Sequence, residues 1–119
     1  MYLAIVLDEE SKNKLINQFK DIIPDNWKIF CHHMTINLKG YIPNEEYQLG
    51  QEEIITATHL GMNEKVIAVK VLSNIKSVNV VKHVTIATAP ESKPKDSKEI
   101  QTWHTIKPII LKGKILVQD

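Results

Sequence analysis

The chain contains no arginine, and all 15 of its basic residues are lysines. The planar fork of arginine grips a phosphate with two parallel hydrogen bonds, whereas lysine offers a point charge. A phosphate site in this protein therefore has to be built from lysines, hydroxyls and histidines. The formal net charge is only +1, so no overall field draws the chain onto nucleic acid or an anionic membrane. A nucleic acid would have to be met locally, at an end or in a loop.

Cysteine and long apolar segments are also scarce. Cys31 is the one cysteine, so an internal disulfide is excluded, which fits a reducing cytosolic compartment. The opening apolar run 2–7 is too short to cross a bilayer, and acidic residues follow it directly. We interpret this run as a core strand and expect a cytoplasmic protein without a membrane segment.

The sequence has the composition of an ordinary globular domain. With 119 residues, 43% hydrophobic and 24% charged, the chain can bury a core but has little room for a second domain. We therefore expect one domain over residues 1–119.

Apolar periodicity predicts a mixed α+β fold with one long helix near the N-terminus. An acidic start at Asp8 and apolar residues spaced along one face predict a helix that reaches Ile23. A second, short helix is expected from a cap at Asp96 or Ser97 to Trp103. Runs with strand composition cover 2–8, 27–38, 53–60, 66–72 and 80–89, and the tail 106–117, broken at Gly113, adds one or two more.

One four-residue pattern occurs twice. His33–Ile36 reads His-Met-Thr-Ile and His83–Ile86 reads His-Val-Thr-Ile. Since side chains alternate along a strand, the histidine and threonine of each copy share one face and the two apolar residues share the other. A single copy is typical of a structural, hydrogen-bonded histidine, but two copies among five histidines favour a function. We expect both copies to converge on a central cleft between antiparallel strands, backed by an apolar core.

Two histidines with two hydroxyls suit acid–base chemistry on a phosphodiester without a metal. Histidine titrates near neutral pH, so one imidazole can accept a proton from water while the other donates one to the leaving oxygen. We assign these roles to His33 and His83, in an order that the sequence leaves open. The hydroxyls of Thr35 and Thr85 would then stabilise the nonbridging oxygens.

Zinc is the competing interpretation of the same residues. Zinc binds three or four close ligands, and Cys31, His32 and His33 are adjacent in the chain. Neighbours in a strand point to opposite faces, so His32 is expected to face away from His33 and the three cannot chelate together. His59 would add a third ligand at most, and the threonines would have no role. We therefore expect no metal and no cofactor. A nucleophilic role for Cys31 has no other support.

Four further side chains are candidates for substrate contact: His59, Tyr41, Lys93 and Lys95. His59 ends a strand, where a structural role is an equal alternative. Tyr41 can stack on a base, as can Trp103, for which core packing is the default. The two lysines follow the second motif closely enough to reach a bound phosphate, although solvated lysines are the simpler interpretation.

On its two motifs the chain resembles the two-histidine (2H) phosphoesterase superfamily, whose signature is two His-x-Thr/Ser-apolar motifs on central strands. His33–Ile36 and His83–Ile86 carry the resemblance, and the opening strand and helix sit where that family has them. The stretch from Thr58 through the second motif to Ser97 is more particularly similar to the cyclic phosphodiesterase domains of tRNA-ligase-type RNA repair proteins.

The resemblance implies a metal-independent α+β fold of two similar lobes around a cleft. It also implies action on 2′,3′-cyclic phosphates, 2′-5′ linkages or small cyclic nucleotides, with His33, Thr35, His83 and Thr85 at the site. The chain departs from the family in size, because its motifs lie only 50 residues apart and one long helix is predicted. This favours a small substrate, or a separate partner protein that recruits the substrate.

The sequence thus predicts a phosphodiesterase that opens a 2′,3′-cyclic phosphate at an RNA 3′ end or in a nucleotide, as in RNA repair or processing. Two alternatives stay open. One is a hydrolase of cyclic oligonucleotide or 2′-5′-linked signals, as in viral counter-defence. The other is a binding module that holds RNA ends or nucleotides without turnover, which the four intact motif residues disfavour.

Overall fold

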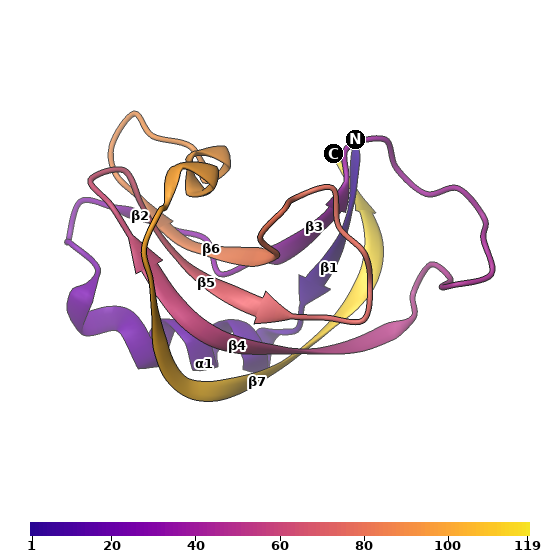
Figure 1. Cartoon of the computed structure of the whole chain (residues 1–119), viewed down its shortest axis with the longest axis horizontal. Helices are drawn as coiled ribbons and strands as arrows, with labels where there is room; N and C mark the ends of the chain where they lie inside the picture. Colours follow the sequence, from indigo (N-terminus) through magenta and orange to yellow (C-terminus); the bar gives the residue numbers. More distant parts are fainter.

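The chain forms one strongly bent antiparallel sheet with an α-helix packed against it (Figure 1). The structure, a computed structural model, describes residues 1–119. None of its helices is long and apolar enough to cross a membrane. In chain order the elements are β1 (Tyr2–Leu7), α1 (Glu9–Phe19), the 3-10 turn η1 (Lys20–Ile22), β2 (Lys28–Ile29), β3 (His33–Asn37), β4 (Glu52–Met62), β5 (Val66–Leu72), β6 (His83–Thr88), the 3-10 helix η2 (Pro94–Glu99) and β7 (Trp103–Gln118).

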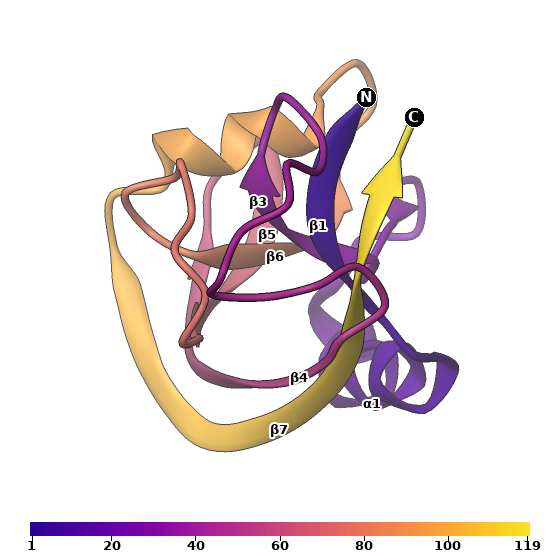
Figure 2. The same ribbon diagram turned by 90° about the vertical axis from the view of Figure 1, so that its right-hand side faces the viewer.

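The strands follow the spatial order β2-β6-β3-β1-β7-β4-β5, and β5 also pairs with β6, which closes six of them into a barrel-like ring. β1 lies between β3 and β7 and pairs Tyr2 with Gln118, so the two termini lie side by side (Figures 1 and 2). The predicted α+β class, the antiparallel pairing and the N-terminal helix are confirmed. All strands belong to one sheet, so the pairing itself marks no boundary between two lobes.

The two faces of the sheet have different roles. One face packs with α1 into the main core, to which β3 contributes Met34 and Ile36 and β6 contributes Val84 and Ile86. Both views show α1 and η2 on opposite sides of the sheet (Figures 1 and 2). Strand alternation therefore turns the polar residues of both motifs toward the side of η2. These residues are His33, Thr35, His83 and Thr85.

Helix α1 is capped at its start and anchored to β7. The carboxylate of Asp8 accepts a hydrogen bond from Ser11 N at 2.8 Å, and the Ser11 hydroxyl accepts one from Lys112 N at 2.7 Å. Leu15 and Phe19 are buried in the main core, where each contributes about 1.5–3 kcal/mol of hydrophobic stabilisation. The acidic start and the apolar spacing read from the sequence account for this helix.

The strand predicted over 27–38 is interrupted, which corrects the sequence-based expectation. β2 ends at Ile29 and β3 begins at His33, with Cys31 between them in the left-handed region at φ 48°. The interruption is needed because Cys31 and Met34 both face the core although they are three residues apart. A regular strand would put them on opposite faces. The left-handed residue shifts the alternation by one position while Cys31 N still donates to Thr85 O at 3.0 Å.

The tail forms one continuous strand of 16 residues, so the predicted break at Gly113 is wrong. Gly113 pairs with Leu7 of β1 and with Glu53 of β4. A Cβ at this position would stand 2.5 Å from the carbonyl oxygen of Val6. Gly113 therefore permits a close approach of two strands and does not end one.

Two boundaries near the second motif also differ from the prediction. β6 begins only at His83, and the chain before it is a loop whose Ser77 hydroxyl donates to Thr35 O at 2.7 Å. The short helix begins at Pro94 with Lys93 as its N-cap, so the predicted cap at Asp96 or Ser97 is wrong. Proline has the fixed φ that suits a first helical position, and Asp96 instead accepts from Lys93 N at 2.9 Å.

Candidate functional site

The two motifs lie side by side in the sheet. β3 and β6 are antiparallel with Met34 opposite Val84, so continuing this register puts His33 across from Thr85 and Thr35 across from His83. The two histidines are then diagonal neighbours, which in antiparallel sheets lie roughly 7–8 Å apart. All four side chains line one pocket of about 420 Å³, together with Tyr2, Leu38, Asn79, Pro94, Lys95 and Lys98.

His83 is held in one orientation by its own chain. Its Nδ1 lies 2.8 Å from the carbonyl oxygen of Val81, and because a carbonyl only accepts, Nδ1 must carry the hydrogen. This fixes the tautomer, so Nε2 is the nitrogen free to exchange a proton with a ligand. Burial lowers the pKa of His83, the bond to Val81 partly offsets this, and Lys98 lowers it further.

His33 shares a hydrogen bond with its neighbour. Nδ1 of His33 lies 2.9 Å from Nδ1 of His32, with the two rings nearly perpendicular at 82°. On the other side, the Tyr2 ring centroid lies 5.1 Å from that of His33. Burial lowers the pKa of His33 to about 4, and the charges of His32 and His83 add to this effect. At neutral pH, His33 is therefore an uncharged imidazole.

The predicted orientation of His32 is wrong. His32 precedes β3 and follows the left-handed Cys31, so strand alternation does not apply between positions 32 and 33. Sequence periodicity had no signal for this break. His32 consequently becomes part of the site as the partner of His33.

The two threonines differ in what their hydroxyls already bind. Oγ1 of Thr85 lies 2.8 Å from Oγ of Ser97 and 3.4 Å from the carbonyl oxygen of Pro94, both in η2. Thr35 is half-buried, and its hydroxyl has no hydrogen bond within the chain. Thr35 is thus free to bind a ligand directly, whereas Thr85 is supported from behind by Ser97.

Of the two lysines predicted to reach a phosphate, the structure brings one to the pocket. Lys95 lines it, and so does Lys98, which the sequence reasoning missed. Residues three apart in a 3-10 helix project from the same side, so the spacing would have found Lys98 had η2 been predicted in its place. Lys93 caps η2 and is not among the lining residues.

Two other predicted substrate contacts lie away from this pocket. His59 is on β4, where Nδ1 is 2.8 Å from the Thr58 hydroxyl, and β5 separates β4 from β6. Tyr41 packs against Tyr47, at 6.3 Å between ring centroids, and against the main core. Both therefore have structural surroundings, because the strand order and the long loop after β3 carry them elsewhere.

Several lining residues have no signal in the sequence. Tyr2 reaches the site because β1 pairs with β3, which puts Ala4 opposite Thr35 and the Tyr2 ring 5.1 Å from that of His33. Asn79 reaches it because Val78 N donates to Ile36 O at 2.9 Å and holds the preceding loop over β3. Both placements depend on contacts between segments far apart in the chain, which local patterns do not encode.

The alternatives to histidine chemistry can be compared with the same geometry. Cys31 is fully buried, and burial raises the pKa of its thiol to about 12, with a smaller opposing effect of Lys12. The thiolate needed for nucleophilic attack does not form at neutral pH. No three His, Cys, Asp or Glu side chains gather as a metal-binding group.

No protein-family model matches the chain, and neither curated proteins nor solved structures include a match.

Proposed function

We propose that this protein is a metal-independent phosphodiesterase that hydrolyses a 2′,3′-cyclic phosphate at an RNA end or in a nucleotide. The observation that carries the proposal is that both His-x-Thr motifs line one pocket with Lys95 and Lys98. The two imidazoles can transfer protons to and from a phosphodiester. The two hydroxyls and two ammonium groups can stabilise the negative charge that develops on its oxygens. The expected cytoplasmic location, the RNA repair context and the likeness to 2H phosphoesterases stay predictions.

The different surroundings of the histidines support different roles. His33, with its pKa lowered to about 4, is deprotonated at neutral pH and is the general base. This role requires that His33 donates the Nδ1 hydrogen to Nδ1 of His32, 2.9 Å away, so that Nε2 takes the proton from water. His83 is the general acid, because the Val81 carbonyl that accepts from Nδ1 favours the imidazolium form. Burial still lowers the pKa of His83 on balance, and the negative charge of a bound phosphate opposes that shift.

In the proposed step, water attacks phosphorus as it loses a proton to His33, and the bond from phosphorus to one ribose oxygen breaks. His83 gives that oxygen a proton. Charge on the nonbridging oxygens is balanced by Lys95, Lys98 and the two threonine hydroxyls. In this step the Ser97 hydroxyl donates to Thr85 Oγ1. The Thr85 hydroxyl, which donates to the Pro94 carbonyl over 3.4 Å in the structure, then donates to a phosphate oxygen instead.

Turnover in the presence of EDTA tests the proposal. The panel contains 2′,3′-cyclic nucleotides, an oligonucleotide with a cyclic phosphate end, 2′-5′ oligoadenylate and cyclic dinucleotides. His33→Ala and His83→Ala should each lower kcat by at least about 100-fold, the usual contribution of a general acid or base. His59→Ala is the matched control, since that histidine lies on the same sheet but not in the pocket.

Unaltered kcat in either histidine variant would remove that residue from the mechanism. A folded protein that binds nucleotides but cleaves nothing on the panel would point to the binding module instead. Cleavage of only the 2′-5′ or cyclic dinucleotide substrates would favour the signalling hydrolase.

A further inference from the structure

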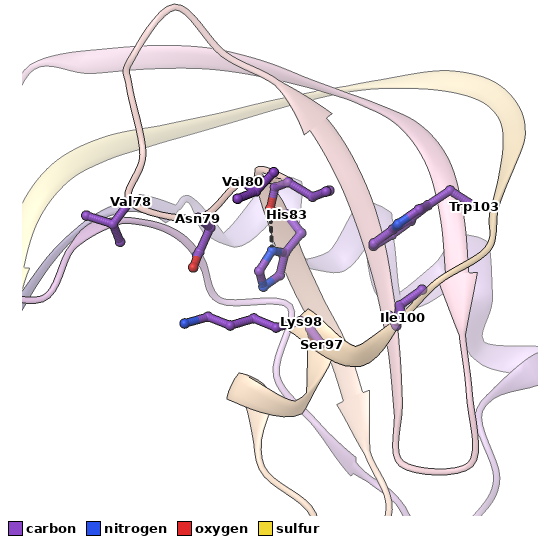
Figure 3. A pocket seen from close by; sticks show the side chains of 9 residues that line it. Val78, Asn79, Val80, His83, Ser97, Lys98, Ile100 and Trp103 are labelled. Carbon is purple, nitrogen blue, oxygen red and sulfur yellow. Dashed lines mark hydrogen bonds between the residues drawn. The ribbon is translucent and has the colours of Figure 1, made fainter.

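A second pocket of about 260 Å³ adjoins the first on the other side of His83. The two pockets share Asn79, His83 and Lys98. Figure 3 shows the His83 imidazole and the Trp103 indole across this space from each other, with Asn79 and the Lys98 amine beyond His83. The first pocket, called the phosphate pocket below after its proposed ligand, and the second pocket are therefore two parts of one site, divided by the His83 imidazole.

The second pocket is apolar on the side away from the phosphate pocket. Trp103 and Ile100 form its far wall, and Val78 and Val80 come from the loop before β6 (Figure 3). Val80 is fully exposed, at 102%. An apolar, planar part of a ligand in this pocket would contact the indole of Trp103 and the side chain of Ile100.

The indole of Trp103 packs directly against the backbone of Gly61, where there is no room for a side chain. Gly61 of β4 lies opposite Trp103 in the strand register, and a Cβ at Gly61 would stand 2.6 Å from both the indole and the Ile100 side chain. Trp103 also packs against a small core of Val66, Ala68 and Ile100. Its ring is thus rigidly backed by the sheet while its other side borders the pocket.

We propose that the second pocket binds the nucleobase of the same nucleotide whose phosphate lies between His33 and His83, with Trp103 as the stacking surface. This inference rests on the proposed function and adds its substrate class, a single nucleoside cyclic phosphate, free or at a chain end. A rigid indole beside an apolar wall suits a base of any kind, because each base has a π face. With the phosphate and ribose in the first pocket and the base in the second, one nucleotide contacts both pockets, so further nucleotides are not needed for recognition.

The test compares a substrate with a base and one without it. The pair is adenosine 2′,3′-cyclic phosphate and the 2′,3′-cyclic phosphate of 1-O-methylribose. Trp103→Ala should lower kcat/KM for the adenosine compound by about 5- to 150-fold, the range for losing one stacked base, and leave the base-free compound unchanged. Trp103→Phe should restore most of the loss, and Trp27→Phe is the control for the other tryptophan, which packs on the main core.

An equal loss for both substrates in Trp103→Ala would overturn the base site while leaving the phosphodiesterase proposal intact. A second readout covers the case in which nothing is cleaved. In the Trp27→Phe protein, Trp103 is the one remaining tryptophan, and its fluorescence should be quenched by adenosine 2′-monophosphate but not by ribose 5-phosphate. Quenching by adenosine 2′-monophosphate without any turnover would contradict the proposed function and support the base site. Absence of quenching would overturn the base site.

Discussion

At the scale of the residue, the site depends on how each histidine nitrogen is occupied. The Val81 carbonyl fixes Nδ1 of His83 as a donor, and His32 occupies Nδ1 of His33 at 2.9 Å. In the proposed mechanism, the nitrogen that exchanges a proton with the substrate is therefore Nε2 in both histidines. The same pattern, in which a partner on one nitrogen orients the other, is a general feature of histidine catalysis.

His32→Ala tests this pairing. We expect kcat to fall by about 10-fold or more, because His33 loses the hydrogen-bond partner of its Nδ1 that orients the ring, with little change in KM. Removing His32 also removes a charge effect that lowers the pKa of His33, so the acidic limb of the kcat/KM profile should move to higher pH. A steady-state pH series measures both effects.

His104→Ala serves as the control, since His104 is exposed and lies on β7 outside the pocket. A His32 variant whose acidic limb stays in place would show that His32 does not act on His33.

At the scale of the element, β7 shows how a glycine can be mistaken for a strand end. Its 16 residues pair with both β1 and β4. Gly113 lies where the two partners overlap, and Val6 O occupies the place of a side chain. A glycine inside a strand commonly marks such a close approach of backbone.

Gly113→Ala should therefore destabilise the fold, although alanine is the better strand residue by conformational entropy alone. The obstacle is backbone at 2.5 Å, so β1 or β7 must shift, and overpacking of this kind costs about 1–3 kcal/mol. Urea unfolding measures the change.

Lys114→Ala is the matched control, because Lys114 is the exposed neighbour on the same strand. Equal unfolding midpoints for the two variants would show that the strands separate at no cost.

At the scale of the whole molecule, the two half-buried motif histidines, His33 and His83, link stability to pH. In the unfolded chain, histidine binds protons near pH 6.5, whereas in the fold the pKa of His33 is about 4 and that of His83 is also lowered. The unfolded state therefore binds more protons between these values, so the free energy of unfolding rises with pH in this window.

We expect the free energy of unfolding to be highest above pH 6.5 and to fall as the pH drops toward 4, with His33 contributing on the order of 3 kcal/mol. Urea titrations at pH 7.5 and 4.5 measure the difference. His33→Gln should remove most of it, and a variant with the same pH dependence as the original chain would contradict the shifted pKa of His33.

Much of the fold was predictable because it follows from local periodicity. The apolar spacing after Asp8 predicts α1, and β5 lies at the predicted residues 66–72. The alternation within His33–Ile36 and His83–Ile86 correctly assigns one polar and one core face to each motif. Lys98, Tyr2 and Asn79 were not predictable, because they reach the pocket only through η2, the β1–β3 pairing and the loop before β6.

The sequence by itself determined which motif residues share the polar face and which the core face of each strand, because side-chain direction in a strand is a local property of the backbone. The tertiary structure alone decided that Met34 pairs with Val84 and that Gly61 makes room for Trp103. These are contacts between backbone segments whose relative placement depends on closure of the whole sheet, and no local pattern specifies them.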